Sequence, residues 1–142
     1  MKKAMEGIRI LDLSQYIAAP YAASIMADLG AEVYKIERGG GSESGDVARS
    51  FGPFYDGMSL YFATFNRNKK FMTLNLKTPG GVDLFKQMVP HADIVIQNFR
   101  PKVMERLGIG YEELKKIKPG IILASISGFG QEGHMAHKPA LD

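Results

Sequence analysis

Apolar residues along the chain fall into short runs, separated by longer stretches in which they recur every three or four positions. Short apolar runs bounded by glycine, proline or charged residues are typical of buried strands. These runs predict strands over residues 7–13, 31–37, 71–76, 93–99 and 120–127.

The stretches between these runs carry the signals of helix ends. Pro20 suits the first turn of a helix, and Gly30 suits the position just past its end. Thr78 is a favourable cap for a helix that starts with Pro79. Such signals, with the spacing of apolar residues, predict helices within residues 16–30, 59–70, 78–92, 100–108 and 111–117.

The alternation of strands and helices predicts the fold class. Parallel strands joined by helices form right-handed crossovers, which place helices on both faces of one sheet. We therefore expect an α/β fold with a Rossmann-like, doubly wound and mostly parallel sheet, formed as one domain by residues 1–142. Ligands of such sheets bind beyond the carboxyl ends of the strands, so the loops there are the first candidates for a site.

Composition narrows the class of protein. Apolar residues at 45% and charged residues at 23% are ordinary for a soluble domain, and no run approaches the roughly 20 apolar residues of a membrane span. The first residues also lack the apolar core of a signal peptide. With no cysteine and three histidines, neither disulfides nor a zinc site is expected. These features favour a cytoplasmic protein without a membrane partner.

Arg38 is the most informative charged residue. It ends the predicted strand 31–37 and is followed by a glycine-rich segment, residues 39–57, expected to be a loop. A net charge of +3 suits an anionic small ligand and does not require nucleic acid, and the guanidinium fork of arginine suits a phosphate. From the residues alone, a solvated Arg38 is equally compatible. We interpret Glu37 as a surface residue.

The loop after the first strand lacks the G-x-G-x-x-G pattern that brings a backbone close to a pyrophosphate. A nicotinamide or flavin dinucleotide is therefore disfavoured. Arg100 and Arg106 lie near a predicted helix start, where one suits a phosphate and the other suits a pair with Glu105 or Glu112. The residues alone do not decide between them. They indicate a basic ligand edge for a phosphorylated small molecule.

Two other clusters do not indicate sites. The stretch "NRNKK" (66–70) is interpreted as a solvated turn rather than a nucleic-acid patch, because no aromatic residues are interleaved with its charges. His134 and His137 share a glycine-rich segment that offers no third ligand, so no metal is expected there.

Several motifs in a fixed order resemble one family. The stretch "GIRILDLSQYIAAPYAASIMADLGAEVYKIER" resembles the N-terminus of the class III (family III) coenzyme A transferases. That group includes formyl-CoA, carnitine and bile-acid CoA-transferases, and α-methylacyl-CoA racemase is a close relative. The similarity continues through "SLYFATFNRNKKFMTLNLKTPGG", "ADIVIQNFRPKVMERLGIGYEEL" and "PGIILASISGFGQEG". It extends essentially from end to end.

The resemblance implies a site for coenzyme A and no metal. Arg38 matches the residue that holds the adenosine and phosphate end, whereas Ile17 and Ala18 match the lining of the pantetheine and thioester region. Some members have glutamine where this chain has Ile17, so a side-chain hydrogen bond is not expected there. The other matching positions are Leu74, Asn75, Lys77, Asn98, Phe99, Arg100, Arg106 and Lys138.

The resemblance also implies a reaction. In the family an aspartate attacks an acyl-CoA thioester, and the resulting anhydride becomes an aspartyl-CoA thioester that passes CoA to a free carboxylic acid. This covalent route divides one difficult step into easier ones. The aspartate matches a segment downstream of residue 142, so no catalytic residue is expected in this CoA-binding, N-terminal part. Asp142 matches a different acidic position, and a frayed terminus does not hold a nucleophile.

Two alternatives to a transferase are weighed. Related racemases have a histidine just before the acid that corresponds to Asp142, and this chain has Leu141 there, which favours the transferase. A non-catalytic CoA- or nucleotide-binding module remains the alternative from another class, because the nucleophile is missing. Full-length relatives form interlocked dimers, so a homo-oligomer is expected.

Overall fold

Five parallel strands form the main sheet of the computed structural model, which describes residues 2–41 and 44–140. The chain builds one side of this sheet first and then crosses to the other side of its first strand. The order of strands therefore reverses beside β1, and the crevice at such a point is where ligands of these folds bind. Across the sheet the strands are β5 (Lys70–Leu74), β2 (Glu32–Arg38), β1 (Arg9–Asp12), β6 (Ile94–Gln97) and β7 (Ile122–Ser125).

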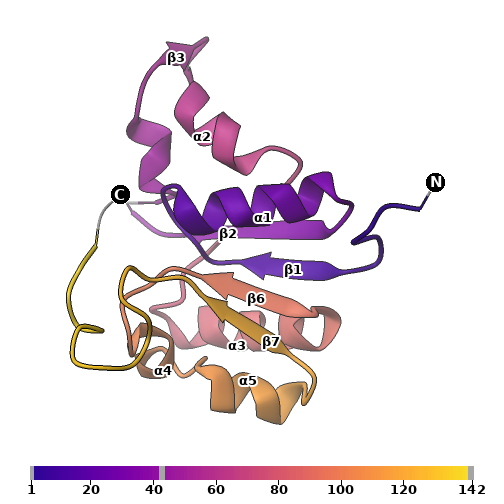
Figure 1. Cartoon of the computed structure of the whole chain (residues 1–142), viewed down its shortest axis with the longest axis vertical. Coiled ribbons are helices and arrows are strands. Elements are labelled where there is room, and N and C mark those ends of the chain that lie inside the picture. Colours follow the sequence, from indigo (N-terminus) through magenta and orange to yellow (C-terminus); the bar gives the residue numbers. More distant parts are fainter. Residues whose placement is uncertain (1, 42–43, 141–142) are drawn as a thin grey trace.

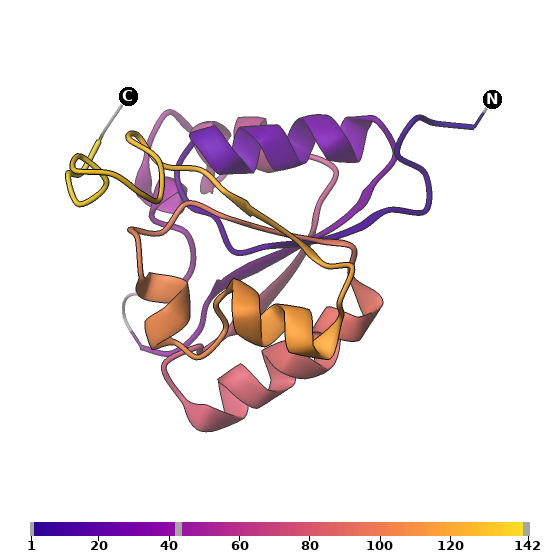
Figure 2. The same ribbon diagram turned by 60° about the horizontal axis from the view of Figure 1, so that its bottom comes forward.

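Helices cover both faces of the sheet, which confirms the predicted doubly wound α/β fold (Figures 1 and 2). One face carries α1 (Ala18–Asp28), against which α2 (Leu60–Asn66) packs. The other face carries α3 (Pro79–Met88), α4 (Val103–Arg106) and α5 (Tyr111–Ile117).

None of the helices in the described part of the chain is long and apolar enough to cross a membrane.

The two faces have separate apolar cores because successive strand residues point to opposite sides. Ile10 and Val33 are buried in the core under α1, next to small alanines that let the helix lie close to the sheet. Leu11 and Val95 are buried in the core under α3 and α5. That second core also contains Phe85, Val89, Met104, Ile109, Leu114 and Ile121.

The segment 39–57, expected to be a loop, contains structure of its own. A short 3₁₀ helix, η1 (Val47–Ser50), is capped by the Asp46 carboxylate, which accepts a hydrogen bond from the Ala48 N–H at 3.0 Å. Strand β3 (Phe54–Tyr55) then pairs antiparallel with β4 (Met58–Ser59) in a hairpin that projects from the end of the molecule (Figure 1). The sequence predicted only a loop here because glycines are frequent in this segment.

Helix boundaries follow the predicted caps with two exceptions. The Thr78 hydroxyl accepts a hydrogen bond from the Gly81 N–H at 3.2 Å and starts α3 as expected, and α5 has the predicted bounds. The helix expected over 100–108 is only one turn, α4, because Lys102 before it has φ +67°. The helix expected over 78–92 divides into α3 and a 3₁₀ turn, η2 (Val89–His91).

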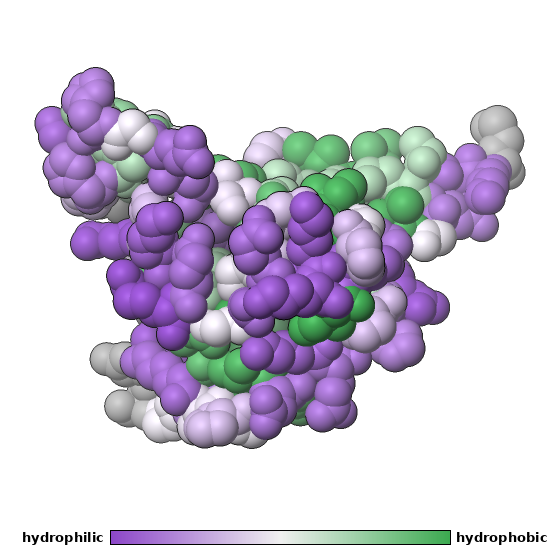
Figure 3. Space-filling view, turned by 90° about the horizontal axis from the view of Figure 1, so that it is seen from below, coloured by the Kyte–Doolittle hydropathy of each residue, from purple (hydrophilic) through white to green (hydrophobic). Residues whose placement is uncertain are grey.

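The outward face of α1 is apolar. Tyr21, Ile25 and Leu29 recur every four residues along it, and each is 42–45% exposed. Figure 3 shows the molecule from the β7 edge of the sheet, where hydrophilic side chains dominate and hydrophobic side chains gather along the upper border, toward α1. A helix that faces water normally carries polar residues on its outer side, so this face of α1 is unusual.

Candidate functional site

A cavity of about 210 Å³ opens at the carboxyl ends of the central strands. Residues from the ends of β1, β2, β5 and β6 and from the start of α4 enclose it. Five of the residues predicted to bind coenzyme A line this one cavity: Arg38, Leu74, Asn75, Lys77 and Phe99. Its remaining lining is Leu13, Gln15, Ile36, Glu37, Leu76, Val103 and Leu107.

Arg38 reaches the cavity because of the alternation along β2. Ile36 belongs to the core on the α3 side of the sheet and also lines the cavity, so Arg38, two residues further, lies on the same side. The side chain is partly buried among apolar walls. A charge in such surroundings is screened less than on an open surface, and so attracts an anion more strongly.

Two glycines allow β2 and α3 to lie close to the end of β5. The Gly39 N–H donates to the Leu74 carbonyl at 3.1 Å, and a Cβ at position 39 would lie 3.2 Å from the carbonyl carbon of Leu74. A Cβ at Gly81 would lie 2.0 Å from the Asn75 oxygen, which no side chain allows. Gly81 therefore brings the start of α3 against the end of β5.

The turn between β5 and α3 is held by its own polar groups. Asn75 Oδ1 accepts from the Lys77 N–H at 3.0 Å, and the Asn75 carbonyl accepts from the Thr78 hydroxyl at 2.8 Å. Lys77 is exposed at the cavity mouth beside the first turn of α3. Free N–H groups at a helix start favour negative charge, so Lys77 and the start of α3 both make this edge favourable for an anion.

Asn98 joins the two central strands beyond their ends. Its side-chain oxygen accepts from the Gln15 N–H at 2.9 Å, and its side-chain nitrogen donates to the Gln15 carbonyl at 2.7 Å. The two bonds continue the sheet across the point where the strand order reverses. Asn98, predicted to bind the ligand, therefore has its amide engaged with the β1 loop.

The structure does not bring the other predicted residues into this cavity. Ile17 precedes α1 and Ala18 begins it, while Arg106 and Lys138 are exposed on α4 and after β7. Arg100 lines a separate hollow of about 620 Å³ beside α4, α5 and β7.

The expectation that one of these two arginines pairs with Glu105 or Glu112 is not supported. Neither Arg100 nor Arg106 forms a salt bridge with Glu105 or Glu112, all of which lie within the described ranges.

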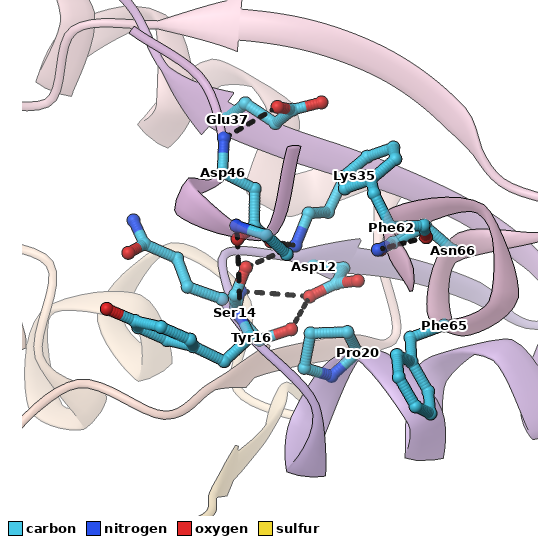
Figure 4. A network of polar contacts seen from close by, with 12 residues as sticks. Asp12, Ser14, Tyr16, Pro20, Lys35, Glu37, Asp46, Phe62, Phe65 and Asn66 are labelled. Atoms are coloured by element: carbon cyan, nitrogen blue, oxygen red, sulfur yellow. Dashed lines mark hydrogen bonds and ion pairs between the residues drawn. The ribbon is translucent and has the colours of Figure 1, made fainter. Parts of the chain in front are cut away.

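A buried network of charged groups lies on the α1 side of the same strands and was missed in the sequence (Figure 4). Lys69 Nζ is 2.8 Å from Asp12 Oδ2, and Lys35 Nζ is 2.8 Å from Asp46 Oδ2. None of these four side chains is exposed to solvent. Lys35 and Asp12 lie within predicted buried strands, and this position was the sign in the sequence that their side chains could face the interior.

Lys69 has an acceptor for each of its three protons. Besides Asp12, it donates to the Pro20 carbonyl and to Asn66 Oδ1, both at 2.8 Å. Burial lowers the pKa of the Lys69 ammonium from its ordinary value, and the Asp12 carboxylate opposes this shift. The three acceptors are those of a charged ammonium.

Asp12 also braces the turn that follows β1. Its Oδ1 accepts from the Ser14 N–H at 2.9 Å and from the Ser14 hydroxyl. Both carboxylate oxygens are therefore engaged.

The interpretation of Glu37 as a surface residue is wrong. Glu37 is 5% exposed, and its carboxylate accepts from Arg49 Nε at 2.7 Å, from Arg49 Nη2 at 2.6 Å and from the Asp46 N–H at 2.8 Å. Burial raises the pKa of Glu37, but these hydrogen bonds outweigh burial and leave it below its ordinary value. The guanidinium of Arg49 also lies 3.8 Å from the Phe62 ring centroid, which gives it an apolar support.

The interpretation of "NRNKK" (66–70) as a solvated turn is also wrong. Asn66 and Lys69 are buried, and the three remaining side chains bind acids on neighbouring elements. Arg67 and Asn68 bind Asp28 at the end of α1, and Lys70 binds Glu32 on β2. The stretch attaches α2 and β5 to the rest of the fold.

Within the described ranges no group of three or more histidine or acidic side chains is placed to hold a metal ion. His134 and His137 lie in the segment after β7, and His91 lies in η2 beside α3.

The comparison with known proteins agrees with the motifs in the sequence. The family model described as "CoA-transferase family III" matches residues 5–142. The chain is 47% identical to an acetyl-CoA:oxalate CoA-transferase of Acetobacter aceti and 45% identical to a succinyl-CoA:glutarate CoA-transferase of Mus musculus. Both matches cover 99% of this chain but only 36% and 32% of those proteins. The chain thus spans about a third of the length of these relatives.

A solved structure shows the same fold. The crystal structure of a CAIB/BAIF family protein from Brucella suis superposes with a TM-score of 0.90 at 34% identity. The match covers all of this chain and 38% of that one.

Proposed function

Because this chain belongs to CoA-transferase family III, we propose that it is the CoA-binding portion of an enzyme that moves CoA from an acyl-CoA thioester to a free carboxylic acid. The observation that carries this proposal is the gathering of five predicted residues around one cavity at the carboxyl ends of the strands. The relatives named above are CoA-transferases, which supports transfer rather than racemisation.

The cavity suits the nucleotide end of CoA. Leu74 and Phe99 offer apolar walls for a purine, while Arg38 and Lys77 place positive charge at its mouth. CoA carries a 3′-phosphate and a diphosphate, and such groups are bound by arginine forks and lysine point charges. Val103 and Leu107 of the α4 region line the cavity. Arg106, which lies between them in the sequence, and Arg100, which follows β6, are proposed to reach the phosphates from the same edge of the sheet.

The pantetheine arm is proposed to run from this cavity toward Ile17, Ala18 and Lys138. Gln15 lines the cavity, and the chain continues directly from it to Ile17 and the start of α1. The thioester would then lie at the end of the β1–α1 segment, defined here as residues 14–18.

The aspartate nucleophile is proposed to come from outside residues 1–142. Three acids of the described residues that lie near the site, Asp12, Glu37 and Asp46, are buried and already bound to lysine or arginine. A nucleophile needs a free carboxylate that faces the thioester. Asp142, with residue 141, lies outside the described part of the chain.

Residues 1–142 are proposed to act as one domain of a homo-oligomeric enzyme.

The proposal is tested by calorimetry of the chain with CoA, with AMP as the comparison ligand. We expect CoA to bind more tightly than AMP, because AMP lacks the 3′-phosphate, the second phosphate and the arm. The affinity should fall with added salt, since salt screens the exposed Lys77 and Arg106. CoA binding no better than AMP, with the fold intact by circular dichroism, would remove the proposed site.

A further inference from the structure

Asp46 connects two segments that border the proposed site. It follows the segment that begins after Arg38, and its side chain reaches the loop between β1 and α1 (Figure 4). Asp46 Oδ1 accepts from the Tyr16 N–H at 3.2 Å and from the Ala48 N–H at 3.0 Å, and Oδ2 accepts from Lys35 Nζ at 2.8 Å. The residue is only 3% exposed, so its position is fixed by the protein.

The β1–α1 segment depends on this acceptor. Tyr16 has φ +65°, a backbone conformation that costs a non-glycine residue about 1–2 kcal/mol. Ile17 caps α1 without a side-chain hydrogen bond, so the helix start has no cap of its own. Strained backbone persists only where surrounding contacts impose it. The Tyr16 N–H has its contact in Asp46.

Neighbouring contacts fix the rest of the segment. Lys35 also donates to the Ser14 carbonyl, and Asn98 holds both backbone groups of Gln15. Asp46 therefore completes a series of three consecutive anchors, at Ser14, Gln15 and Tyr16. The anchored residues lead from the cavity wall to Ile17.

We propose that Asp46 is a positioning residue that fixes the β1–α1 segment for the pantetheine arm of CoA. The inference rests on the proposed function, because it takes CoA as the ligand. Asp46 itself does not touch the ligand. It acts by holding Tyr16 and Ile17 in their bound geometry beforehand, so that less conformational freedom is lost when the arm binds. Its loss should therefore weaken contacts to the arm and leave contacts to the nucleotide unchanged.

The test uses two double variants that both remove the buried Lys35–Asp46 ion pair. Removing one partner alone would leave a buried charge and endanger the fold, whereas apolar replacement of a whole pair is often tolerated. Lys35→Met/Asp46→Asn keeps an oxygen for the Tyr16 N–H, and Lys35→Met/Asp46→Leu does not. Each is titrated with CoA and with adenosine 3′,5′-bisphosphate, which has the nucleotide but no arm.

The Leu variant should bind CoA about five- to ten-fold more weakly than the Asn variant, the effect of about one hydrogen bond. Both variants should bind the bisphosphate equally. Equal CoA affinities, or an equal loss for both ligands in the Leu variant, would overturn the positioning role. Wild-type protein that binds neither ligand would overturn the proposed function, and this inference with it.

A second measurement on the wild-type chain does not depend on how the variants fold. In amide NMR spectra, CoA should shift the resonances of Tyr16, Ile17 and Ala18, whereas the bisphosphate should not. CoA that binds in the cavity without moving these three resonances would contradict the inference while leaving the nucleotide site intact.

Discussion

Lys69 and Asp12 are 57 residues apart in the sequence, and their side chains form an ion pair with no exposure to solvent. The pair joins the turn before β5 to the end of β1. A buried charge needs a partner and further hydrogen bonds to offset the loss of water. Lys69 obtains these from Pro20 and Asn66, and Asp12 obtains them from Ser14.

Lys69→Met should lower the free energy of unfolding by about 3–5 kcal/mol, because it leaves the Asp12 carboxylate buried without a partner. Urea unfolding measures the change. Lys70→Met is the matched control, since Lys70 is the next residue and pairs with Glu32 at the surface, where ion pairs contribute little. If both variants lose the same stability, the buried pair does not have the assigned role.

Arg38→Met should weaken CoA binding by about 1.5–3 kcal/mol, the range for hydrogen bonds that involve a charged group. Arg67→Met is the control, because it removes the same charge from a side chain that binds Asp28 at the far end of α1. Calorimetry of the two variants separates a specific contact from a general effect of net charge. Equal affinities in Arg38→Met and Arg67→Met would leave Arg38 without a role in binding.

Acid should destabilise the fold through Glu37. Its pKa is lower in the folded chain than in the unfolded chain, so its contribution is present above the unfolded value and is lost as the pH falls through the folded value. Glu32, whose pKa is lowered to about 2 chiefly by its hydrogen bond with Lys70, contributes in the same direction. The stability that these two carboxylates contribute is therefore lost as the pH falls from near 4.5 to about 2.

Glu37→Gln should be less stable than wild type at pH 7, and the difference should shrink below about pH 4. Urea unfolding at a series of pH values measures both curves. A difference that stays constant from pH 7 to pH 3 would mean that the Glu37 charge does not stabilise the fold.

The chain should associate with itself through the outward face of α1. Tyr21, Ile25 and Leu29 are exposed there, and large exposed apolar areas favour association. Sedimentation at rising concentration should show a dimer or a larger species, and Ile25→Lys should shift it toward monomer. Gln87→Lys, on the exposed side of α3, should leave it unchanged. A wild-type monomer at high concentration would refute this expectation.

Residues 1–142 alone should not transfer CoA. In a mixture of acyl-CoA, a carboxylic acid and hydroxylamine, an acyl-enzyme would be trapped as a hydroxamate. We expect none, because Asp12, Glu37 and Asp46 are bound to cations and buried. Hydroxamate that forms with the wild-type chain and disappears in Asp142→Asn would show that the terminal aspartate is a nucleophile after all.

The sequence by itself determined the family and the order along the chain of the five strands of the main sheet and the helices between them. Short apolar runs and helix caps such as Thr78 are local signals, and they depend on neighbouring residues that the sequence displays. The position of Arg38 at a strand end followed from the same pattern. So did its place at the edge of the sheet where the strands end, because the carboxyl ends of parallel strands share one edge.

Only the tertiary structure decided which charged residues are buried. In the sequence, nothing distinguishes Glu37 and Lys69 from charged residues exposed to solvent. Their partners Arg49 and Asp12 lie 12 and 57 positions away. A charge is stable inside a protein only when the fold brings an opposite charge to it. The separation of Arg100 from the cavity of Arg38 was decided in the same way, by how α4 packs beside the sheet. Contacts between distant segments have no signature in a single sequence, because they arise from packing rather than from local preference.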